Sequence, residues 1–255
     1  MHRMVEGACR RSLGSVGPLH RPLGGPPPPP GEENGPAFLM TRFVIAVDGP
    51  AASGKGTIAT RLGREFGLPV LDTGLLYRAV GVLTARAGGN PDHAAAAHAI
   101  AVKLSAGQLD DPALRTRAAG ELASRVAVHG QVREALLAFQ HAFAGQAGGA
   151  VLDGRDIGTV ICPRAPAKLY VSATPEVRAE RRWKQLKGQG EDVAYGDVLA
   201  DIHRRDARDG GRDAAPMVAA PDAVLLDTTE MTIEQAADAA RRIVEAARAR
   251  WETSH

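Results

Sequence analysis

The chain has 255 residues, of which 31 are basic and 29 acidic, so its formal net charge is only +2. This near balance argues against the broad cationic surface of a nucleic-acid-binding protein, and any cationic site must be local. Cys9 and Cys162 lack the spacing of a disulfide framework or a zinc site, and no apolar stretch is long enough to span a bilayer. We therefore expect a cytoplasmic protein, monomeric, without nucleic-acid or membrane partners.

Residues 1–39 differ in composition from the rest of the chain. Arg, Gly and Pro dominate them, and the run from Pro26 to Pro30 favours extended polyproline II. We expect a disordered N-terminal extension rather than a transit peptide, since the segment has neither a convincing amphipathic helix nor a secretory apolar region. As an alternative, the natural chain starts at Met40, directly before the first predicted strand, and the extension is a start-site artefact.

The remaining chain alternates between buried strands and helices. Apolar runs that predict strands cover 43–47, 68–71, 150–152, 168–171 and 223–226. Helical patterns cover about 55–66, a segment after Gly74, and about 232–250. This order predicts an α/β fold with a parallel five-stranded sheet core and helices on both faces. Because aromatic residues make up only 4% of the chain, its core must consist mainly of Ala, Val, Leu and Ile.

Two longer insertions between the strands are predicted to be helical. Residues 91–144 form Ala-rich helical stretches that break near Gly107 and again near Pro112. Residues 175–209 form two charged helices with a hinge near 188–190. A charged helical pair between two buried strands is typical of a flap that closes over a ligand.

A glycine-rich loop joins the first predicted strand to the first helix. It consists of Gly49, Pro50, Ala51, Ala52, Ser53, Gly54, Lys55, Gly56 and Thr57. Small residues let backbone N–H groups converge on phosphate oxygens, the helix N-terminus adds positive potential, and Lys55 can bridge the transferred phosphoryl group. The general P-loop motif has Ser or Thr directly after the lysine, whereas here Gly56 precedes Thr57. A turn without a ligand is disfavoured, because glycine, lysine and the strand–helix context coincide.

Charged residues at the ends of later strands indicate a second anion site. Thr73 could cap the helix after the second strand, and Arg78 could reach an anion in the crevice. The segment DGRD, which contains Asp153 and Arg155, follows the third strand, at the edge where open α/β sheets bind ligands. Asp153 could hold a metal-bound water or orient arginines. The alternatives are a surface position for Arg78 and a turn closed by a surface pair of Arg155 with Asp156.

The predicted flap carries arginines at both ends. Arg205, Asp209 and Arg212 are four and three residues apart, so they would share a face if the helix continued. Similarly spaced arginines near its start, which could neutralise ATP as the flap closes, are Arg178, Arg181 and Arg182. For any one of these arginines, the alternative is a solvent-exposed position at a charged helix end. Phosphoryl transfer to an ionised acceptor phosphate needs positioning and charge stabilisation, so no general base is expected.

Four segments resemble bacterial cytidylate kinases, P-loop nucleoside monophosphate kinases, in their order along the chain: GPAASGKGT, DTGLLYR, DGRDIGTV and RDARDGGR. The similarity covers about residue 41 to the C-terminus. It implies transfer of the γ-phosphoryl group of ATP to CMP or dCMP, with Mg²⁺ accompanying ATP and contacting Thr57. Within a domain at 40–255, it implies a nucleoside monophosphate (NMP) binding region at about 74–145 and a lid at about 175–212.

The resemblance also implies roles for individual residues. Lys55, Arg155 and Asp153 are the expected catalytic groups, and the phosphate loop with Arg178 and Arg182 is the expected ATP site. The expected CMP-binding residues are Thr73, Tyr77, Arg78, Ser124, Arg133, Arg155, Asp156, Arg205, Asp209 and Arg212. Among them, Arg78 and Arg155 resemble ligands of the CMP phosphate, and Arg205 with Asp209 resembles the sugar site. The residues that resemble readers of cytosine are Ser124, Arg133, Asp156 and Arg212.

Two features stand apart from the resemblance. Sequence pattern alone predicts that Ser124 and Arg133 lie on helix surfaces. Many bacterial cytidylate kinases have short strands in the NMP-binding region, whereas residues 91–125 here are helical in pattern. The alternatives to CMP phosphorylation are a kinase for UMP, AMP or shikimate and, in another class, a non-catalytic ATP-binding regulatory protein.

Overall fold

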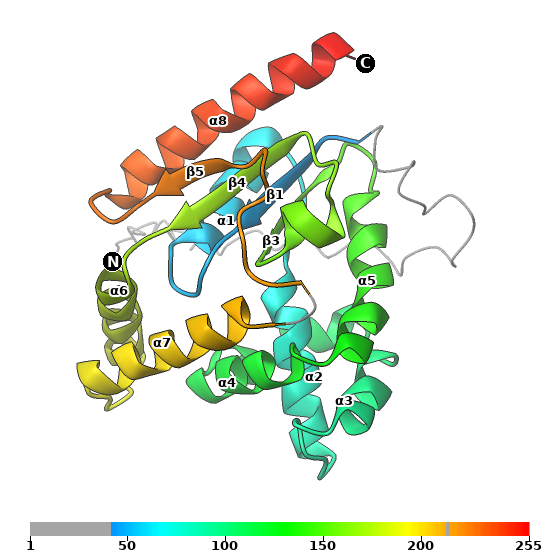
Figure 1. Cartoon of the computed structure of the whole chain (residues 1–255), viewed down its shortest axis with the longest axis vertical. Coiled ribbons are helices and arrows are strands. Elements are labelled where there is room, and N and C mark those ends of the chain that lie inside the picture. Colours follow the sequence, from blue (N-terminus) through cyan, green and yellow to red (C-terminus); the bar gives the residue numbers. More distant parts are fainter. Residues whose placement is uncertain (1–41, 213–214, 255) are drawn as a thin grey trace, which may run out of the picture.

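The computed structural model describes residues 42–212 and 215–254, so the expected disordered extension lies outside the described residues. Within them, parallel strands form a five-stranded sheet in the order β2-β3-β1-β4-β5 (Figure 1). The strands are β1 (Val44–Asp48), β2 (Val70–Asp72), β3 (Ala150–Gly154), β4 (Ala167–Ser172) and β5 (Val224–Asp227). The predicted α/β class and five-stranded sheet are confirmed, with each strand within two residues of its expected bounds.

The central strand β1 explains why helices cover both faces. Alternate side chains of a strand point to opposite faces, and both sets are apolar here. Ile45 and Val47 pack against α1 (Lys55–Phe66) and α8 (Ile233–Ser254), while Val44 packs into the core on the other face. Aliphatic residues dominate both cores, as expected from the low aromatic content.

The chain between β2 and β3 is helical throughout. Its helices are α2 (Thr73–Arg86), α3 (Ala94–Ala101), α4 (Arg117–Val126) and α5 (Gly130–Ala144). Two short 3₁₀ turns, η3 (Ala106–Asp110) and η4 (Pro112–Arg115), lie where breaks were predicted. No strand occurs anywhere in 73–149, all of which the structure describes, so the predicted helical insertion is confirmed.

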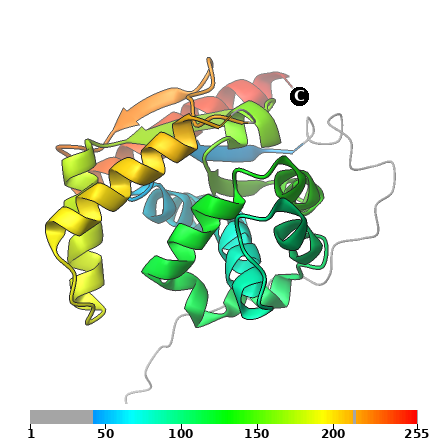
Figure 2. The same ribbon diagram turned by 60° about the horizontal axis from the view of Figure 1, so that its bottom comes forward.

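The chain between β4 and β5 contains the predicted charged pair, α6 (Pro175–Gly188) and α7 (Tyr195–Gly210). Figure 2 shows this pair beside the helices of the first insertion. The pair is less purely polar than its sequence predicts, because Leu186, Val198 and Ile202 form a small apolar cluster that also includes Ala51 of the phosphate loop. The flap therefore packs directly on the loop that is expected to bind ATP.

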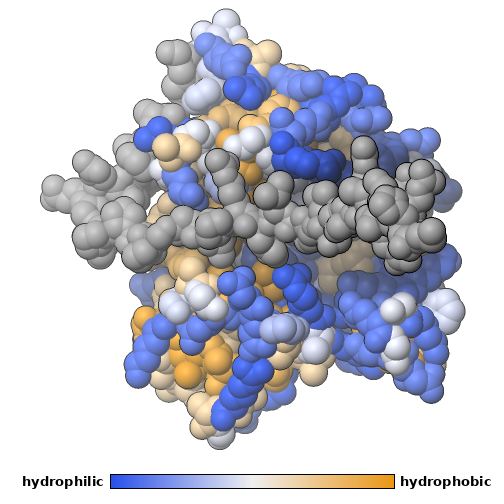
Figure 3. Space-filling model, turned by 180° about the vertical axis from the view of Figure 1, so that it is seen from behind, coloured by the Kyte–Doolittle hydropathy of each residue, from blue (hydrophilic) through white to orange (hydrophobic). Residues whose placement is uncertain are grey.

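Two ion pairs connect the helical insertions through α4 and α7. Arg117 donates to Asp201 at 2.6 Å, and Arg208 forms a two-bond pair with Glu121 at 2.6 and 2.7 Å. Viewed from behind, the surface is largely hydrophilic, with smaller hydrophobic areas between the charged side chains (Figure 3). Of the helices in 42–212 and 215–254, none is long and apolar enough to cross a membrane.

Candidate active site

The phosphate loop leaves the carboxyl end of β1 and enters α1. A Cβ atom at Gly49, whose φ is 144°, would lie 2.0 Å from the carbonyl oxygen of Val171, so only glycine fits there. Gly54, with φ 92°, occupies the N-cap of α1 in a left-handed conformation. Ala52 also has a positive φ of 62°, which is unusual for a residue with a side chain. The loop is therefore folded tightly against β4, and its last turn opens the helix.

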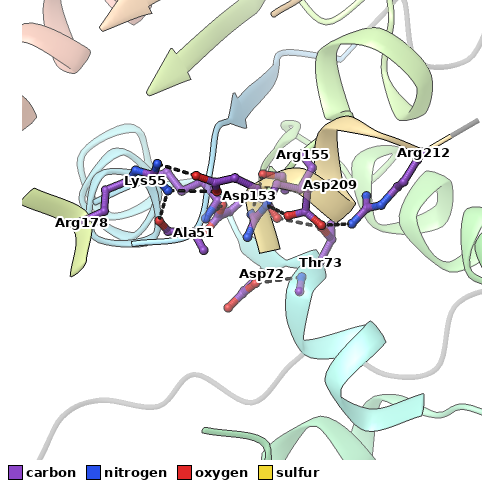
Figure 4. Close-up of polar contacts among 12 residues, drawn as sticks. Ala51, Lys55, Asp72, Thr73, Asp153, Arg155, Arg178, Asp209 and Arg212 are labelled. Carbon is purple, nitrogen blue, oxygen red and sulfur yellow. Dashed lines mark hydrogen bonds and ion pairs between the residues drawn. The ribbon is translucent and has the colours of Figure 1, made fainter. Parts of the chain in front are cut away.

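Lys55 lies at the start of α1, buried beneath the loop. Its Nζ is 3.7 Å from Oδ1 of Asp153, at the end of β3 (Figure 4). Burial lowers the pKa of Lys55, and Arg155 lowers it further, against the opposing effect of Asp153. Burial raises the pKa of Asp153 to about 6, although Lys55 opposes this shift. Burial therefore disfavours the charged form of both Lys55 and Asp153. A bound phosphate would stabilise the charge of Lys55, and its counterion would stabilise that of Asp153.

Gly56, the departure from the general P-loop motif, has a structural reason. A Cβ atom at this position would lie 3.2 Å from Oδ2 of Asp153. Any side chain here would press on that carboxylate, so the glycine leaves room for it. Thr57 comes next and is exposed.

Asp72, rather than Thr73, caps the helix that follows β2. Asp72 is the N-cap of α2 and accepts a hydrogen bond from the N–H of Gly74 at 2.9 Å, so the prediction that Thr73 caps this helix is wrong. The helix begins one residue earlier than a Thr73 cap requires. The Thr73 hydroxyl instead donates to the backbone oxygen of Asp153 at 2.8 Å and joins the ends of β2 and β3.

Asp209 lies between two arginines from different segments (Figure 4). It accepts from Nε of Arg155 at 3.0 Å and from Arg212. Burial alone would raise the pKa of Asp209, but Arg155, Arg212 and Arg205 together bring it below its usual range. The expected continuing helix is wrong in detail, because α7 ends at Gly210. The turn after it still brings Arg212 back to Asp209.

A second buried ion pair joins Arg133 of α5 to Asp156. The Arg133 guanidinium also lies 5.7 Å from the centre of the Tyr77 ring, within the range of a cation–π contact. Ser124 and Arg133 are only 5% and 9% exposed, so the sequence-pattern prediction of helix-surface positions is wrong for both. Asp156 pairs with Arg133 and not with Arg155, which removes the alternative of a surface turn.

Arg78 and Arg205 converge on the same place from α2 and α7. A Cβ atom at Gly120 would lie 3.5 Å from a terminal nitrogen of each. Arg78 donates to the carbonyl oxygen of Leu114 at 2.8 Å, which orients its guanidinium. The pKa of Arg205 is lowered to about 10, mainly by burial and then by the charge of Arg155. Like charges this close favour an anion between them.

The flap arginines differ in what they contact. Arg178 is 3% exposed and donates to Asp206, at 2.6 and 3.0 Å, and to the carbonyl oxygen of Ala51 at 3.3 Å. It thus holds the backbone of the phosphate loop through Ala51 (Figure 4). Arg182 instead lines a cavity of about 540 Å³ between α4 and the α6–α7 pair, together with Arg205.

A sequence model described as cytidylate kinase matches residues 45–246, most of the chain. The chain belongs to the cytidylate kinase family. The cytidylate kinase of Caulobacter vibrioides is 70% identical over 208 residues, which are 82% of this chain and 98% of that protein. That of Xanthobacter autotrophicus is 64% identical over 81% of this chain and 99% of that protein, and that of Rhodopseudomonas palustris is 52% identical over 81% and 98%.

Membership of the cytidylate kinase family confirms the resemblance drawn from the four sequence motifs and the prediction of an enzyme of the kinase class. Sequence reasoning nevertheless missed two buried contacts of this cytidylate kinase site. Asp206 holds Arg178, and nothing in the local pattern signals that pairing. Asp48 accepts hydrogen bonds from Ile157 and Gly158, and its position at the end of a buried strand was the available signal.

Proposed function

We propose that the protein transfers the γ-phosphoryl group of ATP to CMP or dCMP, giving ADP and CDP or dCDP. One observation carries this proposal: cationic groups from separate segments surround one space at the carboxyl edge of the sheet. They are Lys55, Arg78, Arg155 and Arg205. Burial lowers the pKa of each, and for Arg155 the nearby carboxylates, Asp209 first, outweigh this effect. Their mutual repulsion favours binding of two anionic phosphate groups.

The donor phosphates occupy the phosphate loop. Its backbone N–H groups and the N-terminus of α1 cradle the phosphate oxygens, and Lys55 follows the transferred group. Each charge-assisted hydrogen bond contributes about 1.5 to 3 kcal/mol. Arg182 faces the cavity beside this region, so it is a better candidate than Arg178 for direct contact with ATP when the flap closes.

Asp153 and Thr57 are the groups that fit Mg²⁺ bound to ATP. Among the described residues, Oδ1 of Asp153 is a buried oxygen without a hydrogen-bond partner, and Thr57, the exposed third residue of α1, adds a hydroxyl. A few oxygen donors completed by substrate phosphates suit this ion. When bound, Mg²⁺ neutralises charge on the transferred phosphoryl group.

The acceptor lies against the arginines. Arg78 and Arg155 bind the phosphate of CMP, and Arg205 with Asp209 binds its sugar. Because an ionised acceptor phosphate attacks directly, the chain needs no general base, and catalysis rests on in-line positioning and on charge stabilisation by Lys55 and Arg155.

Cytosine is read by groups that are already buried. In the described part of the chain, Oγ of Ser124 has no hydrogen-bond partner, and Asp156 and Arg133 form a neighbouring ion pair. Arg212 completes this set from the end of the flap. A site that hydrogen-bonds the cytosine amino group should reject uracil, because its buried polar groups would then lack partners.

Each of the two helical insertions has its own part in nucleotide binding. We assign the NMP-binding region to α2 through α5 and the lid to α6 and α7, which close over the sheet edge when both nucleotides are present. Closure excludes water from the reacting groups. The cytoplasmic location and the monomeric state remain predictions from the sequence.

A panel of acceptors tests the proposal. ADP release should depend on CMP or dCMP and should be far slower with UMP, AMP or shikimate, as a coupled assay with each acceptor in turn would measure. ADP release with another acceptor but not with CMP would show that the other acceptor is the substrate. ATP binding without release on any acceptor would favour the regulatory alternative.

Replacement of Arg212 by alanine tests the cytosine site. We expect the KM for CMP to rise about 10- to 100-fold with little change in kcat, because one charge-assisted contact to the acceptor is lost. Arg208→Ala is the matched control, since Arg208 lies in the last turn of α7, four residues before Arg212, but pairs with Glu121. Unchanged CMP kinetics in Arg212→Ala would show that Arg212 does not read the base.

A further inference from the structure

Asp48 is a buried carboxylate that connects two loops of the site. It is the last residue of β1, directly before Gly49 of the phosphate loop, and it is 4% exposed. Its two oxygens accept backbone hydrogen bonds from Ile157 at 2.8 Å and from Gly158 at 2.7 Å. The two residues that donate these hydrogen bonds directly follow Arg155 and Asp156. The Asp48 side chain therefore connects the phosphate loop to the segment that carries Arg155 and Asp156.

The two donor groups need an external acceptor. Ile157 and Gly158 open a single π-helical turn, η5 (Ile157–Ile161), and the first N–H groups of a helical turn have no partner within it. The residue before this turn, Asp156, gives it no side-chain cap among the described contacts, because its carboxylate pairs with Arg133. Asp48 therefore caps η5 from another strand.

The backbone on both sides of Asp48 leaves little freedom. A Cβ atom at Gly158 would lie 3.3 Å from Oδ2 of Asp48 and 3.2 Å from Cδ of Lys168, so the two loops are already in close contact. On the other side, Gly49 is fixed against Val171. A small shift of the Asp48 carboxylate would consequently move one loop relative to the other.

The charge on Asp48 is costly where it lies. Its pKa is raised to about 6, mainly by burial and also by Asp156 and Asp153, even though the N–H groups of Gly158 and Ile157 lower it. A neutral group would avoid this repulsion from two nearby acids. The buried carboxylate thus lowers the stability of the fold, and in return it accepts two well-directed hydrogen bonds at the site.

We propose that Asp48 is a positioning residue that sets the Arg155–Asp156 segment against the phosphate loop, and so sets the acceptor phosphate against the donor. The proposal rests on the proposed functions of Arg155 and Asp156. Asp48 contacts neither nucleotide in this scheme, and its effect on the reaction passes through the backbone of Ile157 and Gly158.

The test is Asp48→Asn, which keeps the shape but turns an amide donor toward one of the two N–H groups. We expect kcat to fall about 10- to 100-fold, as for a misplacement of about 1 Å between reacting groups. The affinity for a non-hydrolysable ATP analogue, measured by calorimetry without CMP, should stay within about two-fold of the wild-type value, because the loop itself is intact.

Val244→Ala is the control for stability alone. Val244 is fully buried on α8, among core residues behind the sheet, so its truncation should lower the melting temperature and leave kcat unchanged. If Asp48→Asn lowers the melting temperature in the same way and also leaves kcat unchanged, the contact is structural and the proposal is wrong.

Gly158→Ala probes the same contact with the carboxylate intact. Its Cβ would press on Oδ2 of Asp48, and we expect a smaller fall in kcat in the same direction. Should Asp48→Asn fail to fold, this variant decides: wild-type kcat in folded Gly158→Ala would overturn the proposal. Absence of CMP-dependent turnover in the wild-type protein would instead reject the proposed function, which keeps the two failures distinct.

Discussion

Replacement of Lys55 by alanine should lower turnover of CMP about 10³-fold, as expected when a charged donor to the transferred phosphoryl group is removed. Lys55 lies buried at the start of α1, 3.7 Å from Asp153, and Arg155 is the charged group that most lowers its pKa. Its ammonium group is therefore already desolvated before ATP arrives, and no other lysine lies in the loop. The ADP-release assay at saturating ATP and CMP measures the loss.

Lys187→Ala provides the matched control for Lys55→Ala. Lys187 is an exposed lysine at the end of α6 that pairs with Asp192, so its removal should leave turnover unchanged. Thermal unfolding of both variants checks that the fold is retained. If folded Lys55→Ala keeps more than a tenth of wild-type turnover, Lys55 does not follow the transferred phosphoryl group.

Replacement of Arg155 by alanine should lower kcat/KM for CMP about 10³-fold, because one guanidinium is lost from both phosphate binding and charge stabilisation. The variant should also lose about 1–3 kcal/mol of unfolding free energy, since Asp209 would keep Arg212 but lose the 3.0 Å contact from Arg155. Steady-state kinetics with CMP varied, together with chemical denaturation, separate the two effects.

Two further variants serve as comparisons for Arg155→Ala. Arg155→Lys keeps the charge but not the planar fork, so it should recover only part of the lost activity. Arg204→Ala removes an exposed arginine from α7 that pairs with Asp201, and it should leave kcat/KM for CMP unchanged. Wild-type CMP kinetics in Arg155→Ala would contradict its assignment to the acceptor phosphate.

The sequence predicts the sheet and the phosphate loop well because both depend on local pattern. Helix α1 begins and ends at the predicted residues, Lys55 and Phe66, since a glycine lies directly outside each end. The strands β1 and β3 are short buried runs followed by charged or glycine-rich residues, which locates their ends to within two residues.

The remainder of the site depends on partners far along the chain. Arg178 meets Asp206 and the loop carbonyl of Ala51, and no periodicity reveals those contacts. The sequence pattern places Ser124 and Arg133 on helix surfaces because their own helices carry polar residues around them, yet both are buried. Local pattern reports which face of a helix is apolar, but it does not report which polar side chains another segment covers.

The pairing of the adjacent strands β1 and β3 has a consequence for how the preference for an acceptor nucleotide could change while phosphoryl transfer is retained. Asp48 pairs with Gly154, so the chain segments that lead to the two proposed phosphate sites start side by side, about 4.8 Å apart, the ordinary spacing between hydrogen-bonded strands. Under the proposed function, main-chain geometry therefore fixes where these two segments begin, and side-chain substitutions leave that geometry intact. Residues on α4, α5 and α7 are free to diversify toward other bases while that geometry stays constant.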